Sequence, residues 1–125
     1  EGHSIRSVVP RFFDGTIPDL NLGSAGGESC ALALATRAFE ILNRSPYDAV
    51  WDERFTGGYI TRKFGRPGEN IHALQLELTW KNYMEEEPPY RYLPDRAERL
   101  KATLRPLLEA ILGWAVHNSN DKMRV

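Results

Sequence analysis

The chain has 125 residues, of which 42% are apolar and 26% charged, and its formal net charge is −1. This is the length of one domain with an ordinary globular composition. The near-neutral charge excludes a basic nucleic-acid-binding surface, and no run of about 18 apolar residues predicts a membrane span. The single cysteine, Cys30, excludes an internal disulfide and a multi-cysteine zinc site. The first residues do not resemble a signal peptide, and we expect a cytoplasmic protein.

The first half of the chain predicts a strand, a long loop and a helix. Residues 4–9 are short, β-branched and apolar, and Pro10 ends them, which indicates a strand. Proline and glycine recur from residue 10 to about residue 27, so we predict a loop there, and loops of this length are often functional. Apolar side chains at 3.6-residue spacing then predict a helix from about residue 28 to 43.

The second half predicts further strands and a final helix. Residues 47–53 are predicted as a strand, and residues 56–62 as a turn that continues extended. Residues 71–79 alternate like a half-buried strand, with Gln75 and Glu77 on one face. Asp95 is the expected N-cap of the last helix, in which Pro106 predicts a kink or a new helix start. Strands that alternate with helices favour one α/β domain over residues 1–125.

Two residues are the first candidates for chemistry. Glu77 stands between two leucines of a predicted strand, and burying an unpaired carboxylate is costly. It is therefore either paired with an arginine from a loop or a general base with a raised pKa. His3 stands beside a strand and is either a hydrogen-bonded surface residue or a metal ligand.

Other motifs allow both a structural and a functional interpretation. Arg62 follows a glycine turn, and its guanidinium is either solvated or holds a carboxylate in a bidentate fork. The glycine-rich residues 23–27 precede a predicted helix and could bind an anion there, although a tight loop that caps the helix is the favoured interpretation. Cys30 is predicted to be a core residue.

Five blocks of sequence, in this order, resemble the C-terminal half of the N-formylglutamate deformylase family. They are HSIRS at 3–7, PDLNLG at 18–23, GGYITR at 57–62 with FGRP at 64–67, HALQLE at 72–77 and YMEE at 83–86. The resemblance extends over roughly residues 1–114. It implies a partial α/β domain, a three-layer sandwich around a mixed, mostly parallel sheet, similar to the zinc carboxypeptidases.

The same resemblance implies an activity and a set of site residues. The activity is zinc-dependent hydrolysis of N-formyl-L-glutamate to formate and L-glutamate, a step in histidine degradation. His3 is implied as a ligand of Zn²⁺ or another divalent ion, and Glu77 as the carboxylate that activates the metal-bound water. The residues implied to hold the substrate are Arg62, Arg6, Asn21 and Tyr59.

The chain departs from the family pattern in one important respect. The family's other two metal ligands, a histidine and an acidic residue, precede this region, and neither His72 nor His117 matches their motif. Glu1-Gly2 also stands where the family usually has Asp-Cys or Asp-x before its His-Ser pair. We therefore expect a fragment that is inactive alone, because zinc sites need three or four ligands.

An exposed sheet edge would let such a fragment associate with itself or with a missing N-terminal half. Two other functions stay open. The chain could be part of an amidase for another N-acyl amino acid, or a non-catalytic α/β module that binds a carboxylate or a partner chain. Nucleic acid and membranes are not expected partners.

Overall fold

The structure is a computed structural model that describes the backbone of residues 1–123 and the side chains of residues 1–118. Four strands form one sheet in the order β1-β4-β2-β3. The strands are β1 (Gly2–Ile5), β2 (Leu20–Gly23), β3 (Ala49–Trp51) and β4 (Gln75–Thr79). The β1–β4 and β2–β3 pairs are parallel and the β2–β4 pair is antiparallel, so the sheet is mixed.

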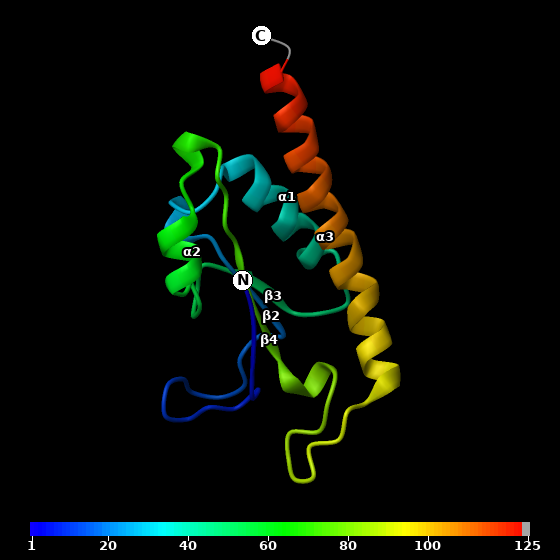
Figure 1. Cartoon of the computed structure of the whole chain (residues 1–125). Helices are drawn as coiled ribbons and strands as arrows, with labels where there is room; N and C mark the ends of the chain where they lie inside the picture. Colours follow the sequence, from blue (N-terminus) through cyan, green and yellow to red (C-terminus); the bar gives the residue numbers. More distant parts are fainter. Residues whose placement is uncertain (124–125) are drawn as a thin grey trace.

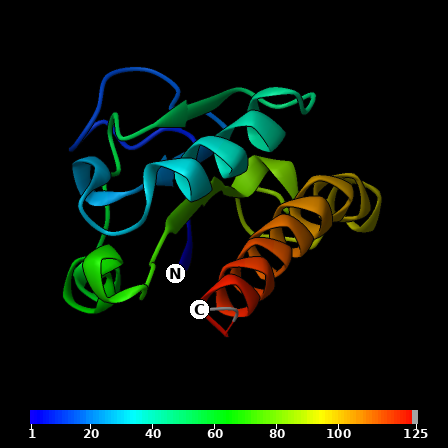
Figure 2. The ribbon, with the colours of Figure 1, turned by 90° about the horizontal axis from the view of Figure 1, so that it is seen from above.

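Three α-helices accompany this sheet (Figure 1). They are α1 (Leu32–Asn43), α2 (Tyr59–Phe64) and α3 (Pro94–Met123), with short 3-10 turns at Ala25–Gly27, Pro67–Glu69 and Trp80–Asn82. Figures 1 and 2 show α2 set apart from the long helix α3. No helix in the described part of the chain combines the length and the apolar character that crossing a bilayer requires.

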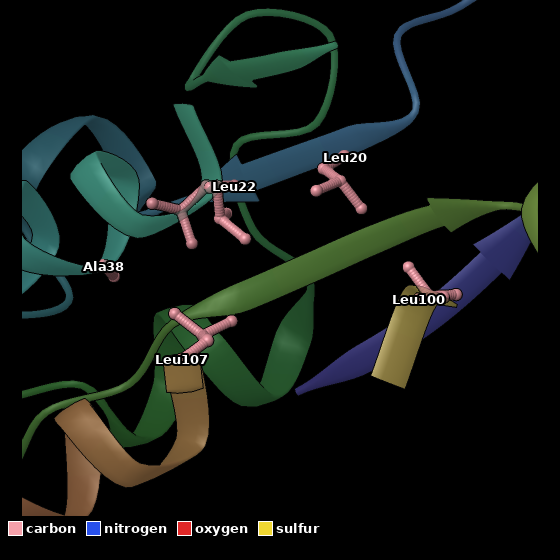
Figure 3. Close-up of a cluster of buried hydrophobic side chains, with 6 residues drawn as sticks. Leu20, Leu22, Ala38, Leu100 and Leu107 are labelled. Atoms are coloured by element: carbon pink, nitrogen blue, oxygen red, sulfur yellow. The ribbon is translucent and has the colours of Figure 1, made fainter. Parts of the chain in front are cut away.

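The hydrophobic core lies on one face of the sheet, under α1 and α3. The fully buried side chains of this cluster come from β2 and from the two helices: Leu20, Leu22, Ala38, Leu42, Leu100 and Leu107. Figure 3 shows the α3 leucines directed toward β2 and β4. Burying one such leucine contributes about 1.5–3 kcal/mol, so this face carries much of the stability of the fold.

Several predicted elements are confirmed with shifted ends. β3 and β4 lie inside the predicted strands 47–53 and 71–79, and the last helix is present. β1 covers residues 2–5 instead of 4–9, because Ser7 leaves the sheet: its amide and its hydroxyl both donate to Glu86 Oε2. α1 begins four residues later than predicted, where the Ala31 amide donates to His72 Nδ1.

Three predictions are wrong. Residues 10–27 are not all loop, because Leu20–Gly23 forms β2, a four-residue strand that is buried throughout. Residues 56–62 do not continue extended, because α2 begins at Tyr59. At the last helix, α3 begins at Pro94, so Asp95 lies in its first turn rather than at the N-cap. The helix continues through Pro106, and no new helix starts there.

Candidate active site

Three polar residues form a row across the sheet, on the face opposite the leucine core. His3 of β1 pairs with Glu77 of β4, and Glu77 pairs in turn with Asn21 of β2. Directly opposed residues on neighbouring strands project to the same face. The strand register therefore brings together three side chains from three distant parts of the sequence, which we call the polar row: His3, Glu77 and Asn21.

The alternation of β4 explains why one face is polar. Gln75, Glu77 and Thr79 are all buried, whereas the intervening Leu76 and Leu78 pack against the apolar core. Successive side chains of a strand point to opposite faces, as predicted for this segment. The result is a strand with a leucine face toward α1 and α3 and a buried polar face on the other side.

Glu77 is a buried carboxyl whose pKa is raised. Its side chain is buried, and burial raises the pKa of its carboxyl above the ordinary value. The nearby His3 opposes this shift, and the negative charge of Glu1 adds to it. In the described residues, no arginine forms an ion pair with Glu77. The salt bridge to a loop arginine is therefore not observed in the described residues, and the general-base role of Glu77 stays a prediction.

Asn21 contributes a buried acceptor to the polar row. The residue is 1% exposed, and its Nδ2 donates to the carbonyl oxygens of Pro18 (2.9 Å) and Glu77 (3.3 Å). Its Oδ1 is buried and has no hydrogen-bond partner among the described residues. An unpaired buried acceptor costs about 1–3 kcal/mol, so Asn21 Oδ1 is a polar atom of the row whose hydrogen-bonding capacity is not used within the described residues.

Glu1 is a site residue that the sequence analysis missed. Its Oε1 accepts from His3 Nε2 at 2.8 Å, and its Oε2 accepts from the Thr61 amide at 2.9 Å and the Thr61 hydroxyl at 2.7 Å. The bond from His3, then those from Thr61, lower the pKa of Glu1 to about 2. The spacing was a usable signal, because residues i and i+2 of a strand share a face.

Helix α2 presents two of the predicted substrate residues. Its N-terminus is attached to the polar face, because the Gly58 amide donates to Gln75 Oε1 and the Thr61 amide to Glu1. Tyr59 and Arg62 lie on this helix and are exposed. Their helix is therefore joined to the polar face, but neither side chain makes a hydrogen bond with the polar row in the described structure.

Arg6 is not brought to the polar row. Its guanidinium donates to Tyr90 Oη at 3.0 Å and lies over the rings of Trp80 and Tyr90. Trp80 in turn donates to Ser4 Oγ, and Ser4 points away from the face that carries His3. The structure thus places Arg6 with the loop after β4.

The described residues do not make a complete metal site. No three His, Cys, Asp or Glu side chains of the described chain lie together in a way that could hold a metal ion. His3 offers one donor, and the Glu1 carboxylate already binds His3 and Thr61. Zinc sites use three or four ligands, so these residues alone do not fit zinc.

Two other motifs have structural roles. Cys30 is buried in the core cluster with Leu34 and Ala35, and burial raises the pKa of its thiol to about 11, as expected for an inert core cysteine. In the glycine-rich residues 23–27, Ser24 Oγ accepts from the Gly27 amide and the Ser24 amide donates to Asp52. This is the tight loop that the sequence favours.

Comparisons with known proteins agree on one family. The family model for N-formylglutamate amidohydrolase matches residues 1–84. The N-formylglutamate deformylases of Pseudomonas aeruginosa and Pseudomonas putida are 47% and 45% identical to this chain over 115 residues. These matches cover 91% of this chain and 43% of each relative, and they correspond to the C-terminal half of those proteins.

A solved structure has a similar fold. The crystal structure of N-formylglutamate amidohydrolase from Ralstonia eutropha JMP134 superposes with a TM-score of 0.69 at 22% sequence identity. The superposition covers 93% of this chain and 41% of the crystallised one. The α/β fold with its mixed sheet is thus shared over nearly the whole chain, although the chain spans less than half the length of its relatives. By the match over residues 1–84 and the curated relatives, the chain belongs to the N-formylglutamate amidohydrolase family.

Proposed function

We propose that this chain supplies part of the active site of an enzyme that hydrolyses N-formyl-L-glutamate to formate and L-glutamate. The observation that carries the proposal is the polar row, in which a buried Glu77 with a raised pKa lies directly beside His3. Two relatives, at 47% and 45% identity, are N-formylglutamate deformylases, which gives the substrate class.

Glu77 is the proposed proton-transfer group. Its carboxylate takes a proton from a water molecule as the water oxygen bonds to the formyl carbon, and it gives the proton to the glutamate nitrogen as the C–N bond breaks. A general base works best with a pKa near the operating pH, and burial moves Glu77 in that direction. The products are formate and the free amino group of glutamate.

The residues on α2 and β2 are the proposed substrate contacts. N-Formylglutamate carries two carboxylates, and Arg62 offers a guanidinium that suits bidentate binding of one of them. Tyr59 lies on the same helix, and Asn21 Oδ1 is a buried acceptor for a substrate N–H. Arg6, which the sequence also suggests for this role, is engaged with Trp80 and Tyr90.

Zinc, or another divalent ion, belongs to the proposal, with His3 as one ligand. When bound, such an ion would supply Lewis acidity in the site. The other ligands would have to come from the part of the relatives that this chain does not span. We therefore expect the isolated chain to bind zinc weakly and to release no formate.

The edge of the sheet is the proposed binding surface for the part of the relatives that this chain does not span. β1 is an edge strand whose Gly2, His3 and Ser4 are exposed. Beside it lies an apolar groove of about 440 Å³, bounded by β1, β4 and α3 and lined by leucines such as Leu76, Leu104 and Leu108. An edge strand beside an apolar groove is a surface that pairs with another segment or another copy.

Reconstitution tests this function. The chain is co-expressed with the N-terminal half of the Pseudomonas aeruginosa relative, and formate release is measured with N-formylglutamate, N-formylaspartate and N-acetylglutamate. We expect metal-dependent turnover that is fastest with N-formylglutamate. A preference for another substrate would favour the general N-acyl amino acid amidase. Unchanged turnover in Glu77→Gln would refute the assigned base, and no turnover from a stable complex would favour a non-catalytic module.

Three further expectations from the sequence stay predictions. They are a likeness of the whole enzyme to the zinc carboxypeptidases, a place in histidine degradation and a cytoplasmic location.

A further inference from the structure

We propose that Glu1 is a positioning residue that links His3 to helix α2, so that one carboxylate sets both the imidazole orientation and the placement of the helix. The link itself follows from the contacts around Glu1. Its consequence for catalysis rests on the proposed function, because His3 and Arg62 have their roles only there.

The Glu1 carboxylate is shared between two partners from distant parts of the chain. Its side chain is only 7% exposed. One oxygen faces His3 Nε2 at 2.8 Å, and the other accepts both the amide and the hydroxyl hydrogen of Thr61. Both oxygens are thus used, and neither partner can change its position without losing a bond to a charged acceptor.

On the His3 side, the carboxylate selects the tautomer. An ionised carboxylate only accepts hydrogen bonds, so His3 Nε2 must carry the hydrogen, and in the neutral ring Nδ1 then keeps its lone pair. A histidine whose second nitrogen binds a carboxylate is fixed in ring orientation and is a more basic ligand. Glu1 therefore leaves His3 Nδ1, and not Nε2, as the nitrogen whose lone pair is available to a metal ion.

On the α2 side, the carboxylate caps a helix that has little stability of its own. α2 has six residues, far fewer than the roughly 12–15 that an isolated helix needs in water. Its N-cap, Gly58, has no side chain to satisfy the first amides. Glu1 Oε2 satisfies the Thr61 amide instead, and so holds the helix that carries Tyr59 and Arg62.

Gly58 gives independent support for this arrangement. A Cβ built on Gly58 would lie 2.7 Å from Glu1 Oε1 and 3.0 Å from Gln75 Oε1. Any larger residue would push these two side chains away from the start of α2. The backbone at Gly58 is thus shaped to let Glu1 reach between His3 and Thr61.

Two substitutions separate the two sides of the link. In Glu1→Gln, the amide oxygen can still accept from Thr61, but the amide NH₂ must donate to His3, so Nε2 becomes the acceptor. In Glu1→Ala, both sides are lost. Glu40→Gln, an exposed carboxylate on α1, is the matched control.

NMR on the whole chain measures both the His3 contact and the Thr61 contact of Glu1, and it does not require catalytic turnover. The ring ¹⁵N shifts of His3 report the tautomer, and hydrogen exchange reports the Thr61 amide. We expect the Nε2–H form in the unsubstituted chain and in Glu40→Gln, and a shift to the Nδ1–H form in Glu1→Gln with Thr61 protection kept. In Glu1→Ala, Thr61 should exchange about 10-fold faster, as expected for losing a bond to a charged acceptor.

Two results would overturn the link. One is a Glu1→Gln chain whose His3 keeps the Nε2–H form, and the other is a folded Glu1→Ala chain with unchanged Thr61 exchange. If Glu1→Ala does not fold, the Glu1→Gln tautomer still decides. Because neither readout depends on hydrolysis, a failed reconstitution would refute the proposed function and leave the link standing.

Discussion

His3 and Glu77 are direct neighbours in the parallel β1–β4 pair, and their side chains share the polar face of the sheet. The pairing fixes their relation through backbone hydrogen bonds rather than through a direct salt bridge. It also places the Glu1 carboxylate close enough to raise the pKa of Glu77. The protonation of Glu77 therefore depends on its burial and on the charges of His3 and Glu1 at the start of β1.

The first prediction concerns Glu77 and pH. The pKa of Glu77 in the folded state is raised above the unfolded value of about 4.5. At pH values between the unfolded and the folded pKa, the folded state therefore holds more of the Glu77 proton than the unfolded state does. The free energy of unfolding should then fall as pH rises through that window. Glu77→Gln should remove this fall, as measured by urea unfolding from pH 4 to pH 8. A parallel pH profile in both proteins would contradict the prediction.

The second prediction concerns Glu1 and has the opposite sign. The folded pKa of about 2 lies below the ordinary 4.5, so the Glu1 carboxylate stabilises the fold fully above pH 4.5. This contribution is lost as pH falls toward 2. The difference in free energy of unfolding between the unsubstituted chain and Glu1→Ala should therefore narrow in acid. The difference between the unsubstituted chain and Glu40→Gln, the control, should stay small at every pH. A gap between the unsubstituted chain and Glu1→Ala that widens in acid would show that the sign is wrong.

The third prediction concerns the leucine core. Leu22→Ala removes a buried side chain that packs against both long helices, and it should lower the free energy of unfolding by about 2–5 kcal/mol. Leu32→Ala, at an exposed position of α1, is the control and should change it by less than about 0.5 kcal/mol. Equal effects in chemical denaturation would mean that the core lies elsewhere.

The fourth prediction uses a pair of glycines. A Cβ on Gly65 would lie 2.4 Å from the Ser29 carbonyl oxygen and 2.7 Å from Ser29 Cα, so Gly65→Ala must displace backbone and should destabilise the fold clearly. Gly113 lies within α3 with open space around it, and Gly113→Ala should stabilise by about 0.5–1 kcal/mol. Thermal unfolding should shift in opposite directions for the two variants.

The fifth prediction separates the two arginines in the reconstituted enzyme. Arg62→Ala should raise KM about 10-fold or more, the effect of losing a charged hydrogen bond to the substrate. Arg6→Ala should leave kcat/KM nearly unchanged and lower stability by about 0.5–1 kcal/mol, because it loses its contacts with Trp80 and Tyr90. A large KM increase for Arg6→Ala would instead support the substrate role that the sequence suggests.

The sequence predicts those elements whose pattern is local. The alternation around Glu77 places β4 and its two faces correctly, and apolar periodicity finds the C-terminal end of α1. The sequence does not predict β2, because its four buried residues, between Pro18 and a glycine-rich loop, show no usable period. Pairing with β3 and β4 makes these residues a strand. Tertiary contacts decide such short segments.

The candidate site shows the same difference between what the sequence indicates and what tertiary contacts decide. The strand register brings together His3, Glu77 and Asn21, three of the residues that the family resemblance implies, while their roles stay predictions. The helical state of α2 could not be predicted, because its N-terminus is satisfied by Glu1 from the start of the chain. Arg6 could not be placed either, since its partners lie in the loop after β4.

β4 separates the two strands that carry His3 and Asn21, which do not touch each other in the sheet. Ribosomal synthesis delivers β1, β2 and β3 first, and none of the polar row can assemble until residues 75–79 have emerged and inserted between β1 and β2. A nascent chain that stalls before Gln75 would therefore expose two unpaired strand edges at once. The last strand of the described sheet to be made is thus the one that brings the polar row together.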